Sequence, residues 1–129
     1  MKLELKHLAS YLPYGLNIKD VKHGSVFEAL HFITTPHQDF SLFKGNLDQL
    51  INDKYLKPIL FPLSQFVKFT FSEEVEECLL NYSADFILNQ TNRLPYFIIQ
   101  EFLSNKIDVF GLIEAGLAEQ VTEDFNPYK

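Results

Sequence analysis

The chain has 129 residues, a net charge of −6 and a single cysteine. A chain of this length forms one domain and buries roughly two-thirds of its unfolded surface, which is enough for a core without disulfides. One cysteine excludes an internal disulfide framework and a cysteine-rich zinc site. We therefore expect a single compact domain over residues 1–129, with no cofactor.

The first residues, MKLELKHLASYL, do not resemble a secretory leader. Glu4, Lys6 and His7 interrupt the apolar stretch that such a leader needs. No apolar run approaches the length of about 18 residues that a membrane helix requires. We expect a reduced, cytoplasmic protein that has no contact with a membrane.

The charge is unevenly distributed along the chain. Residues 1–69 carry eight lysines and six acidic residues, whereas residues 70–129 carry three basic and eleven acidic residues. A basic stripe, the usual footprint of a nucleic-acid binder, is missing, so we expect no direct nucleic-acid binding. The acidic half repels phosphates and attracts a basic protein surface.

The first predicted element is a helix over residues 4–11. Leu5, Leu8 and Leu12 follow a helical spacing, and Pro13 ends the pattern.

Strands are predicted to follow. Residues 16–21 and 25–34 read as a β-hairpin whose turn is Lys-His-Gly at residues 22–24. A third strand is expected in FSLFK, and then a short helix, LDQLIND, which the side chain of Asn46 can cap.

Two prolines four residues apart, Pro58 and Pro62, interrupt the next apolar segment. Because proline lacks a backbone N–H, they exclude a regular helix and a central strand. We expect an edge strand or extended segment there, and a final strand at Phe66–Phe69.

From Ser72 onward the pattern predicts helices. Residues 72–90 are expected to form one helix with Ser72 as its N-cap, because a serine side chain accepts a hydrogen bond from a free amide at that position. Four glutamates lie in its first turn and a half, where the helix dipole favours negative charge: Glu73, Glu74, Glu76 and Glu77.

Pro95 is expected at the first position of a last long helix, YFIIQEFLSNK. Its buried side is predicted to consist of Phe97, Ile98, Phe102 and Leu103. With strands in the first half and helices in the second, the predicted fold class is α+β, a small antiparallel sheet from the N-terminal half packed against helices of the C-terminal half.

The stretch FGLIEAGLA contains two glycines five residues apart, Gly111 and Gly116. The spacing matches part of a phosphate-binding loop, but Leu117 stands where that loop needs lysine. A structural interpretation is preferred, in which Gly116 takes the left-handed position after a last helical turn and Leu117 folds back as a hydrophobic contact. Gly111 is expected to relieve a bend before that turn.

No catalytic or metal-ligating set emerges. The four histidines, at positions 7, 23, 31 and 37, lack the spacing of metal ligands. Cys78 follows two glutamates, which disfavours its thiolate. We expect a protein that is not an enzyme. An enzyme of unrecognised type stays an alternative, and a deep pocket with converging polar groups would distinguish it.

Two tyrosines flank a proline–glycine turn. Exposed aromatic side chains on a stiff turn make good binding anchors, and equally good covers for a sheet. Both interpretations of Tyr11 and Tyr14 stay open. Together with the four glutamates at positions 73, 74, 76 and 77, they are the candidate partner-binding residues.

Three blocks of the chain, LASYLPYGL, KPILFPLSQF and DVFGLIEAGLA, occur in this order between residues 8 and 118. In these blocks the chain resembles a family of small proteins encoded by phages and prophages, although Ile107 stands where that family usually has an aromatic residue. The family has no assigned activity, so no functional residues are carried over. The resemblance implies an accessory protein of a mobile element that acts inside a bacterial cell.

The leading hypothesis is a non-catalytic phage or prophage protein that binds a host protein, in the manner of an anti-CRISPR inhibitor of a defence nuclease. The partner would be a nucleic-acid-binding effector with a basic surface, which the carboxylates at positions 73–77 could occupy. The alternative is a self-associating structural or regulatory phage protein with no defence role.

Overall fold

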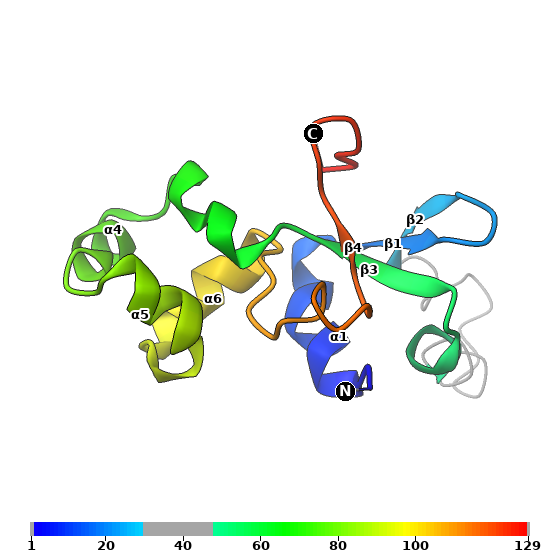
Figure 1. Ribbon diagram of the computed structural model, residues 1–129, viewed down its shortest axis with the longest axis horizontal. Helices are drawn as coiled ribbons and strands as arrows, with labels where there is room; N and C mark the ends of the chain where they lie inside the picture. The colour runs from blue at the N-terminus through cyan, green and yellow to red at the C-terminus, as the bar shows by residue number, and fades with distance from the viewer. Residues whose placement is uncertain (1, 30–47, 129) are drawn as a thin grey trace.

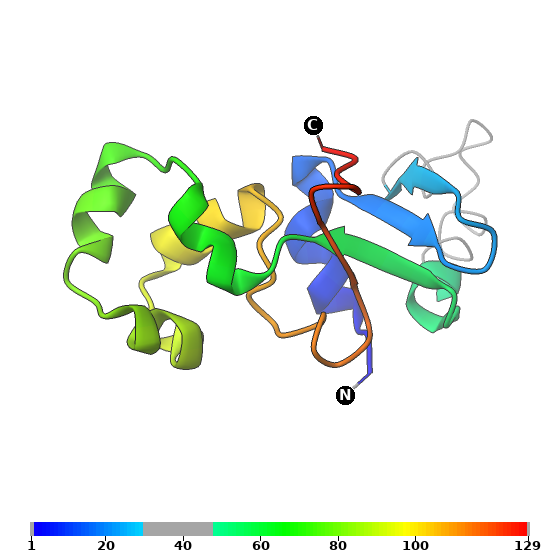
Figure 2. The same cartoon turned by 45° about the horizontal axis from the view of Figure 1, so that its top comes forward.

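The structure, a computed structural model, describes residues 2–29 and 48–128. The fold is α+β and has two lobes that lie side by side along the long axis of the molecule (Figure 1). We call residues 63–104 the α lobe. The remaining described residues, 2–29, 48–62 and 105–128, form the sheet lobe. Figure 2 shows that the chain passes between the lobes through two neighbouring segments, near residues 61 and 107.

The elements follow one another along the chain in this order: α1 (Leu5–Tyr11), η1 (Leu12–Tyr14), β1 (Asn17–Asp20), β2 (Val26–Glu28), β3 (Leu56–Leu60), η2 (Leu63–Lys68), α4 (Glu73–Leu79), α5 (Ala84–Asn89), η3 (Thr91–Arg93), α6 (Tyr96–Ser104) and β4 (Glu119–Gln120). Residues 48–52 are helical as well. The predicted strand FSLFK, the end of the predicted hairpin after residue 29 and the proposed cap Asn46 lie outside the described residues.

The sheet has the strand order β2-β1-β3-β4. β1 pairs antiparallel with β2 and with β3, whereas β3 pairs parallel with β4. The sheet is therefore mixed, which corrects the expectation of an antiparallel sheet built from the N-terminal half. The reason is the crossover that a parallel pair requires, since the whole α lobe is inserted between β3 and β4.

The N-terminal helix and the hairpin turn are confirmed. α1 ends one residue before Leu12, and the backbone amide of Glu4 donates to Nδ1 of His7 at its start (3.0 Å). In the hairpin turn the Asp20 carboxylate accepts the backbone amides of Lys22 and His23, and Gly24 has a φ of +76°. A left-handed residue of this kind is the reason that the turn uses glycine.

Pro58 lies inside β3, which has a neighbour on both sides. This corrects the expectation that proline excludes a central strand. The Val121 amide donates to the Leu60 carbonyl (2.9 Å), so alternation along the strand turns the nitrogen of Pro58 toward β4. β4 pairs only with Ile59 and Leu60, and the missing N–H of Pro58 therefore costs no ladder hydrogen bond.

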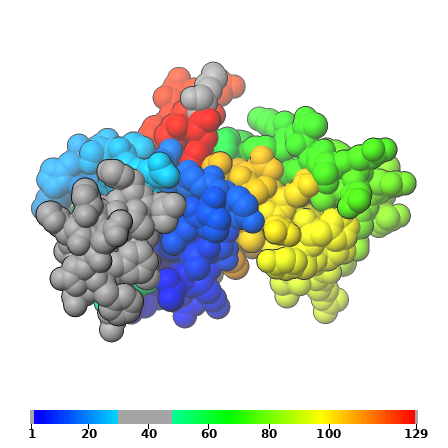
Figure 3. Space-filling model, turned by 180° about the vertical axis from the view of Figure 1, so that it is seen from behind, coloured from blue at the N-terminus to red at the C-terminus, as the bar shows by residue number. Residues whose placement is uncertain are grey.

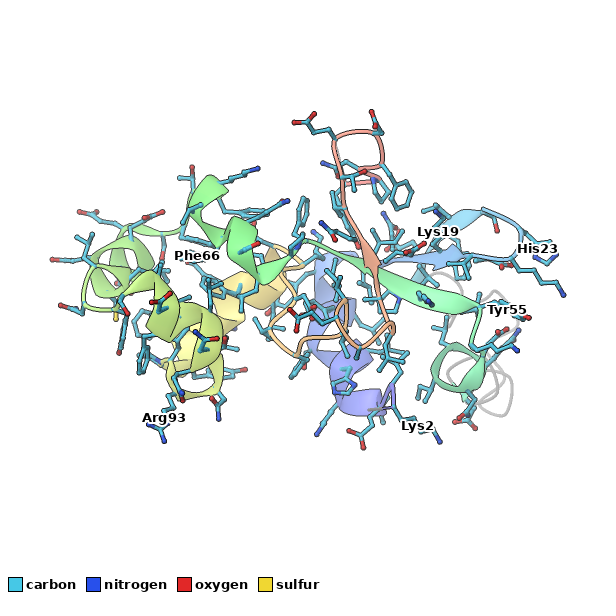
Figure 4. The ribbon with its side chains drawn as sticks, viewed as in Figure 1. Lys2, Lys19, His23, Tyr55, Phe66 and Arg93 are labelled. Atoms are coloured by element: carbon cyan, nitrogen blue, oxygen red, sulfur yellow. The ribbon has the colours of Figure 1, made fainter. Side chains whose placement is uncertain are left out.

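The strand predicted at Phe66–Phe69 is wrong. These residues belong to η2 and its C-cap, with hydrogen bonds from Gln65 to Pro62 and from Phe69 to Phe66. The Phe66 side chain points into the α lobe (Figure 4) and stacks on Phe102 with ring centroids 6.0 Å apart. Burial of this ring favours the tight helical turn over an extended segment.

The single helix predicted over residues 72–90 is two helices. Ser72 caps α4 as expected, by accepting the Val75 amide, and Ser83 caps α5 by accepting the Phe86 amide (3.1 Å). Serine competes with the helical backbone for hydrogen bonds and so favours a new helix start.

Pro95 is the N-cap of α6 instead of its first residue, so that the helix begins at Tyr96, one residue later than expected. Ile98, Phe102 and Leu103 are buried as predicted, but Phe97 is 42% exposed, which corrects its place on the buried side. Phe102 and Ile98 belong to the second of two core clusters, together with Val75 of α4 and Ile87 of α5. The first cluster fills the sheet lobe, and Ile99 and Val109 pack against both.

Gly116 has a φ of +76° and closes the turn that precedes β4. The Leu117 amide donates to the Leu112 carbonyl and the Gly116 amide to the Ile113 carbonyl, a pairing that defines the Schellman motif. Leu117 packs against the first core cluster, and Gly111 is also left-handed, with a φ of +74°. The stretch FGLIEAGLA therefore has the geometry of a closing turn that packs on the core, as the structural interpretation predicted.

One tyrosine holds the segment where the chain returns from the α lobe to the sheet lobe. The hydroxyl of Tyr11, which is fully buried, donates to the Ile107 carbonyl at 2.6 Å and accepts the Val109 amide at 3.2 Å. Phe61 pairs with Ile107 across the two crossing segments. Asp108 accepts the amides of residues 112 and 113, each at 2.9 Å. The crossing segments are thus held to each other and to α1.

We expect Tyr11→Phe to lower the free energy of unfolding by about 0.5–1.5 kcal/mol, because the Ile107 carbonyl and the Val109 amide lose the hydroxyl and keep only their bond to each other (2.9 Å). Urea unfolding followed by circular dichroism measures the loss. Tyr14→Phe is the matched control, because its hydroxyl has no hydrogen-bond partner in the described part of the chain. Equal stability of the two variants would contradict the role of Tyr11.

A second tyrosine completes the β1–β3 ladder. The Tyr128 hydroxyl accepts the Asn17 amide at 2.9 Å and donates to the Ile59 carbonyl at 2.7 Å. Burial raises the pKa of this hydroxyl to about 12. The unfolded chain ionises near pH 10, so the contribution of the neutral hydroxyl is complete below pH 10 and is lost as the pH rises toward 12.

The stability difference between the wild type and Tyr128→Phe is therefore expected to be constant up to about pH 9.5 and to shrink above pH 10. Urea unfolding between pH 7 and pH 11 measures it, and Tyr11, which is unchanged in both proteins, cancels. A difference that stays the same at pH 11 would show that Tyr128 ionises equally in the folded and unfolded states.

Candidate functional site

The α lobe carries an apolar groove of about 340 Å³ on its surface. Three segments supply its walls. They are η2 with the residues after it, α4, and α5 with the turn before it. The lining apolar residues are Phe66, Val67, Phe69, Phe71, Leu79, Leu80, Tyr82, Ala84 and Ile87, and Glu76 is the charged residue among them. We refer to this feature as the apolar groove.

Two residues of the apolar groove are unusually exposed. Val67 is 70% exposed and Leu80 is 86% exposed, although both belong to apolar residue types. Leu79, Tyr82 and Phe69 pack against the second core cluster beneath them. An exposed apolar patch that continues into a core is typical of a surface that meets another molecule.

Four acidic side chains lie on α4, and one of them, Glu76, lines the apolar groove. Glu73, Glu74 and Glu77 are exposed, while the fourth, Glu76, accepts the backbone amide of Phe71 at 3.0 Å. The amide of Ser72 is bound by Glu101 of α6 (3.0 Å). Glu76 therefore holds the start of α4, and the other three carboxylates project from the lobe without an ion-pair partner among the described residues.

The ion pairs of the described residues all lie in the sheet lobe: Lys6–Glu4, Lys19–Glu119 and His23–Asp20. The α lobe contains two cationic and six anionic side chains, a net charge of −4. One of the cations, Arg93, points away from the body of the lobe (Figure 4). The negative charge beside the apolar groove is thus not neutralised within the lobe.

Tyr11 and Tyr14 do not lie with the glutamates. Both belong to α1 and η1 in the sheet lobe, whereas α4 lies at the far end of the α lobe (Figure 1). Tyr11 is fully buried, so it cannot be an exposed anchor, and Tyr14 is half-buried against the first core cluster. Of the two interpretations left open for Tyr11, a binding anchor or a cover for the sheet, its burial agrees with the second. The physical reason is its hydroxyl, which satisfies two backbone groups inside the core.

A second, more polar groove lies beside Asp108, between η2, η3 and the turn at Gly111. Asp108 is buried, but both of its oxygens accept backbone amides. The hydroxyl of Thr91 donates to the Ile87 carbonyl (2.7 Å). The buried polar groups of this groove are therefore engaged in holding backbone, which is a structural role.

The residues considered for metal binding are dispersed. His7 bonds the Glu4 amide and His23 lies beside Asp20, while the histidines at 31 and 37 lie outside the described residues. Within residues 2–29 and 48–128 no group of three metal-ligating side chains comes together. Cys78 is half-buried on α4 and packs against the second core cluster.

None of the helices formed by the described residues has both the length and the apolar character needed to cross a membrane. Comparison with protein-family models, with curated proteins and with solved structures found no match to this chain. The functional argument therefore depends on the geometry and charge of the α lobe itself, which Figure 3 shows projecting from the sheet lobe when the molecule is seen from behind.

Val67 and Leu80 are not among the residues that the sequence predicted to bind a partner. The expected continuous helix over residues 72–90 contained no turn at Leu80, and the expected strand at 66–69 included Val67. One signal was available: Ser83 followed by Ala-Asp is typical of an N-cap and would have ended the first helix before it.

We expect the double variant Val67→Ser, Leu80→Ser to unfold within about 0.5 kcal/mol of the wild type, because both side chains are mostly in water. Urea unfolding measures the difference. Ile98→Ser, at a fully buried position of α6, is the contrasting variant and is expected to lose several times more. A large loss in the double variant would assign Val67 and Leu80 to the core instead of to a binding surface.

Proposed function

We propose that this protein is a non-catalytic binding module and that the apolar groove is the surface with which it binds another protein. The observation that carries the proposal is the exposure of Val67 and Leu80 on one groove. Exposing apolar side chains is unfavourable in a free monomer, and burying them against a partner recovers about 25 cal/mol for each Å² of apolar surface.

The charge of the α lobe supports a partner with a basic surface. Three exposed carboxylates, those of Glu73, Glu74 and Glu77, belong to α4, which supplies one wall of the apolar groove, and they have no ion-pair partner among the described residues. Complementary charge steers two proteins toward each other and discriminates against wrong partners. Host effectors that hold a nucleic-acid backbone expose such basic surfaces.

The resemblance in the three sequence blocks is our reason for proposing that this function belongs to a phage or prophage. On this proposal the protein acts in the cytoplasm of a bacterial host as an accessory protein of the mobile element. It binds a host protein, and the partner class that fits its charge best is a defence nuclease, which it would inhibit in the manner of an anti-CRISPR protein.

A self-associating structural or regulatory phage protein is the second candidate. A specific observation favours it: Tyr96 and Phe97 on α6 are also exposed aromatic residues, 73% and 42% exposed. Multi-angle light scattering separates the two candidates, since a stable closed oligomer supports self-association and a monomer supports binding of a host protein.

The proposal is tested by affinity capture from a nuclease-treated lysate of host cells that express their defence systems. The wild type and the variant Leu80→Ser serve as parallel baits, and Tyr96→Ser is the matched control at another exposed apolar position. We expect wild type and Tyr96→Ser to retain a host nuclease in near-equal amount with the bait, and Leu80→Ser to lose most of it.

Two results would overturn the proposal. Equal recovery of the same partner by all three baits would remove the apolar groove as the binding surface. Baits that recover no partner and behave as one stable oligomer would leave self-association as the function.

A further inference from the structure

We infer that the occupant of the apolar groove is a basic amphipathic helix of the partner, which inserts aliphatic side chains into the groove and places lysine or arginine against α4. This inference rests on the proposed function and adds the chemistry and the secondary structure of the partner segment.

The walls of the apolar groove indicate a helical occupant. An extended peptide binds by adding a strand to a free sheet edge, where main-chain hydrogen bonds supply its affinity. The groove is walled by η2, α4 and α5, which are all helical, so its walls present no strand to which an extended peptide could add. A helix satisfies its own backbone and needs only side-chain contacts, which is what an apolar groove offers.

The size and composition of the groove suit aliphatic anchors. Its volume of about 340 Å³ lies at the low end of the range of ligand pockets, roughly 300–1,000 Å³. Tyr82 stacks on Phe86 with ring centroids 5.2 Å apart, and Phe61 and Phe69 meet edge to face at 5.0 Å. Because these rings already pack on one another, branched side chains of an occupant can contact the exposed Leu80 and Val67 without reorganisation of the aromatic side chains.

The carboxylates decide the charge of the occupant. Glu76 of α4 lines the apolar groove, and Glu73, Glu74 and Glu77 lie on the same helix, so that an occupant of the groove lies against an acidic element. Lysine or arginine at the border of such a contact forms ion pairs at the rim, where they raise the association rate and fix the register.

Charge also argues against a second copy of this chain as the occupant. The described residues of the sheet lobe carry seven lysines and ten acidic side chains, and the α lobe has a net charge of −4. Both lobes are therefore negative and repel the rim of the apolar groove. A nucleic-acid backbone is excluded for the same reason, because its phosphates meet carboxylates.

Three 18-residue peptides test the inference by fluorescence anisotropy with the intact protein. The first is a helix of leucine and lysine, with leucine at the i, i+3, i+4 and i+7 positions. The second replaces every lysine by glutamate, and the third replaces every leucine by serine. We expect the first peptide to bind at least about tenfold more tightly than either of the others, with an affinity that falls as salt rises.

Protein variants assign this binding to the site. We expect Val67→Ser with Leu80→Ser to weaken the first peptide about tenfold or more. The triple variant Glu73→Gln, Glu74→Gln, Glu77→Gln is expected to weaken it and to flatten the salt dependence, while Glu76 is kept for its bond to the Phe71 amide. The matched control neutralises three exposed carboxylates of the sheet lobe, Glu114→Gln, Glu123→Gln and Asp124→Asn, and is expected to leave the affinity within twofold.

The outcomes separate this inference from the proposed function. If the acidic peptide binds as tightly as the basic one, or the groove variants bind the basic peptide normally, the inference is overturned. If at the same time Leu80→Ser still abolishes capture of the host protein, the proposed function stands and the partner segment has a different chemistry. If the basic peptide binds the groove but capture does not depend on Leu80, the proposed function fails.

Discussion

The arrangement of this protein depends on the hydroxyl of Tyr11. It bonds a carbonyl and an amide that are 96 and 98 residues away along the chain, at Ile107 and Val109. These residues lie where the α lobe rejoins the sheet lobe, opposite Phe61, where it leaves. A lobe inserted between two paired strands has two connections. Here Tyr11 fixes the returning one to α1, and Phe61 of the outgoing one is bonded to Lys106 and Asp108 of the returning one. The α lobe, with its groove, is therefore held in place from within the core.

The apolar groove exists because a helix is interrupted. Ser83 starts α5 anew after α4 ends at Leu79, and the turn between them leaves Leu80 outside both helices. In a continuous helix Leu80 would be a helical residue and would not lie in a turn between two helices. The adjoining η2 presents Val67 to the same side because Phe66 has turned inward onto Phe102. Two local choices, a serine cap and an aromatic stack, thus expose two apolar side chains on one surface.

Local signals predicted much of the fold, and distant contacts decided the rest. The caps at Ser72 and near Pro95, the hairpin turn and the α+β class follow from short-range chemistry that a few residues contain. The position of Pro58 inside a central strand does not follow from local chemistry, because it depends on the register of β4, a strand that begins 61 residues later. For the candidate site, the acidic positions on α4 were visible in the sequence, whereas the burial of Tyr11 and the exposure of Leu80 required tertiary packing.

Nuclear magnetic resonance mapping of the bound peptide tests the central claim most directly, because it reports where on the molecule binding occurs. Adding the leucine–lysine helix to the ¹⁵N-labelled protein is expected to shift the backbone amides of η2, α4 and the start of α5. Amides of β1 and β2 in the sheet lobe are expected to stay in place. Shifts concentrated in the sheet lobe, or on α6 around Tyr96, would contradict the assignment of the apolar groove as the binding surface.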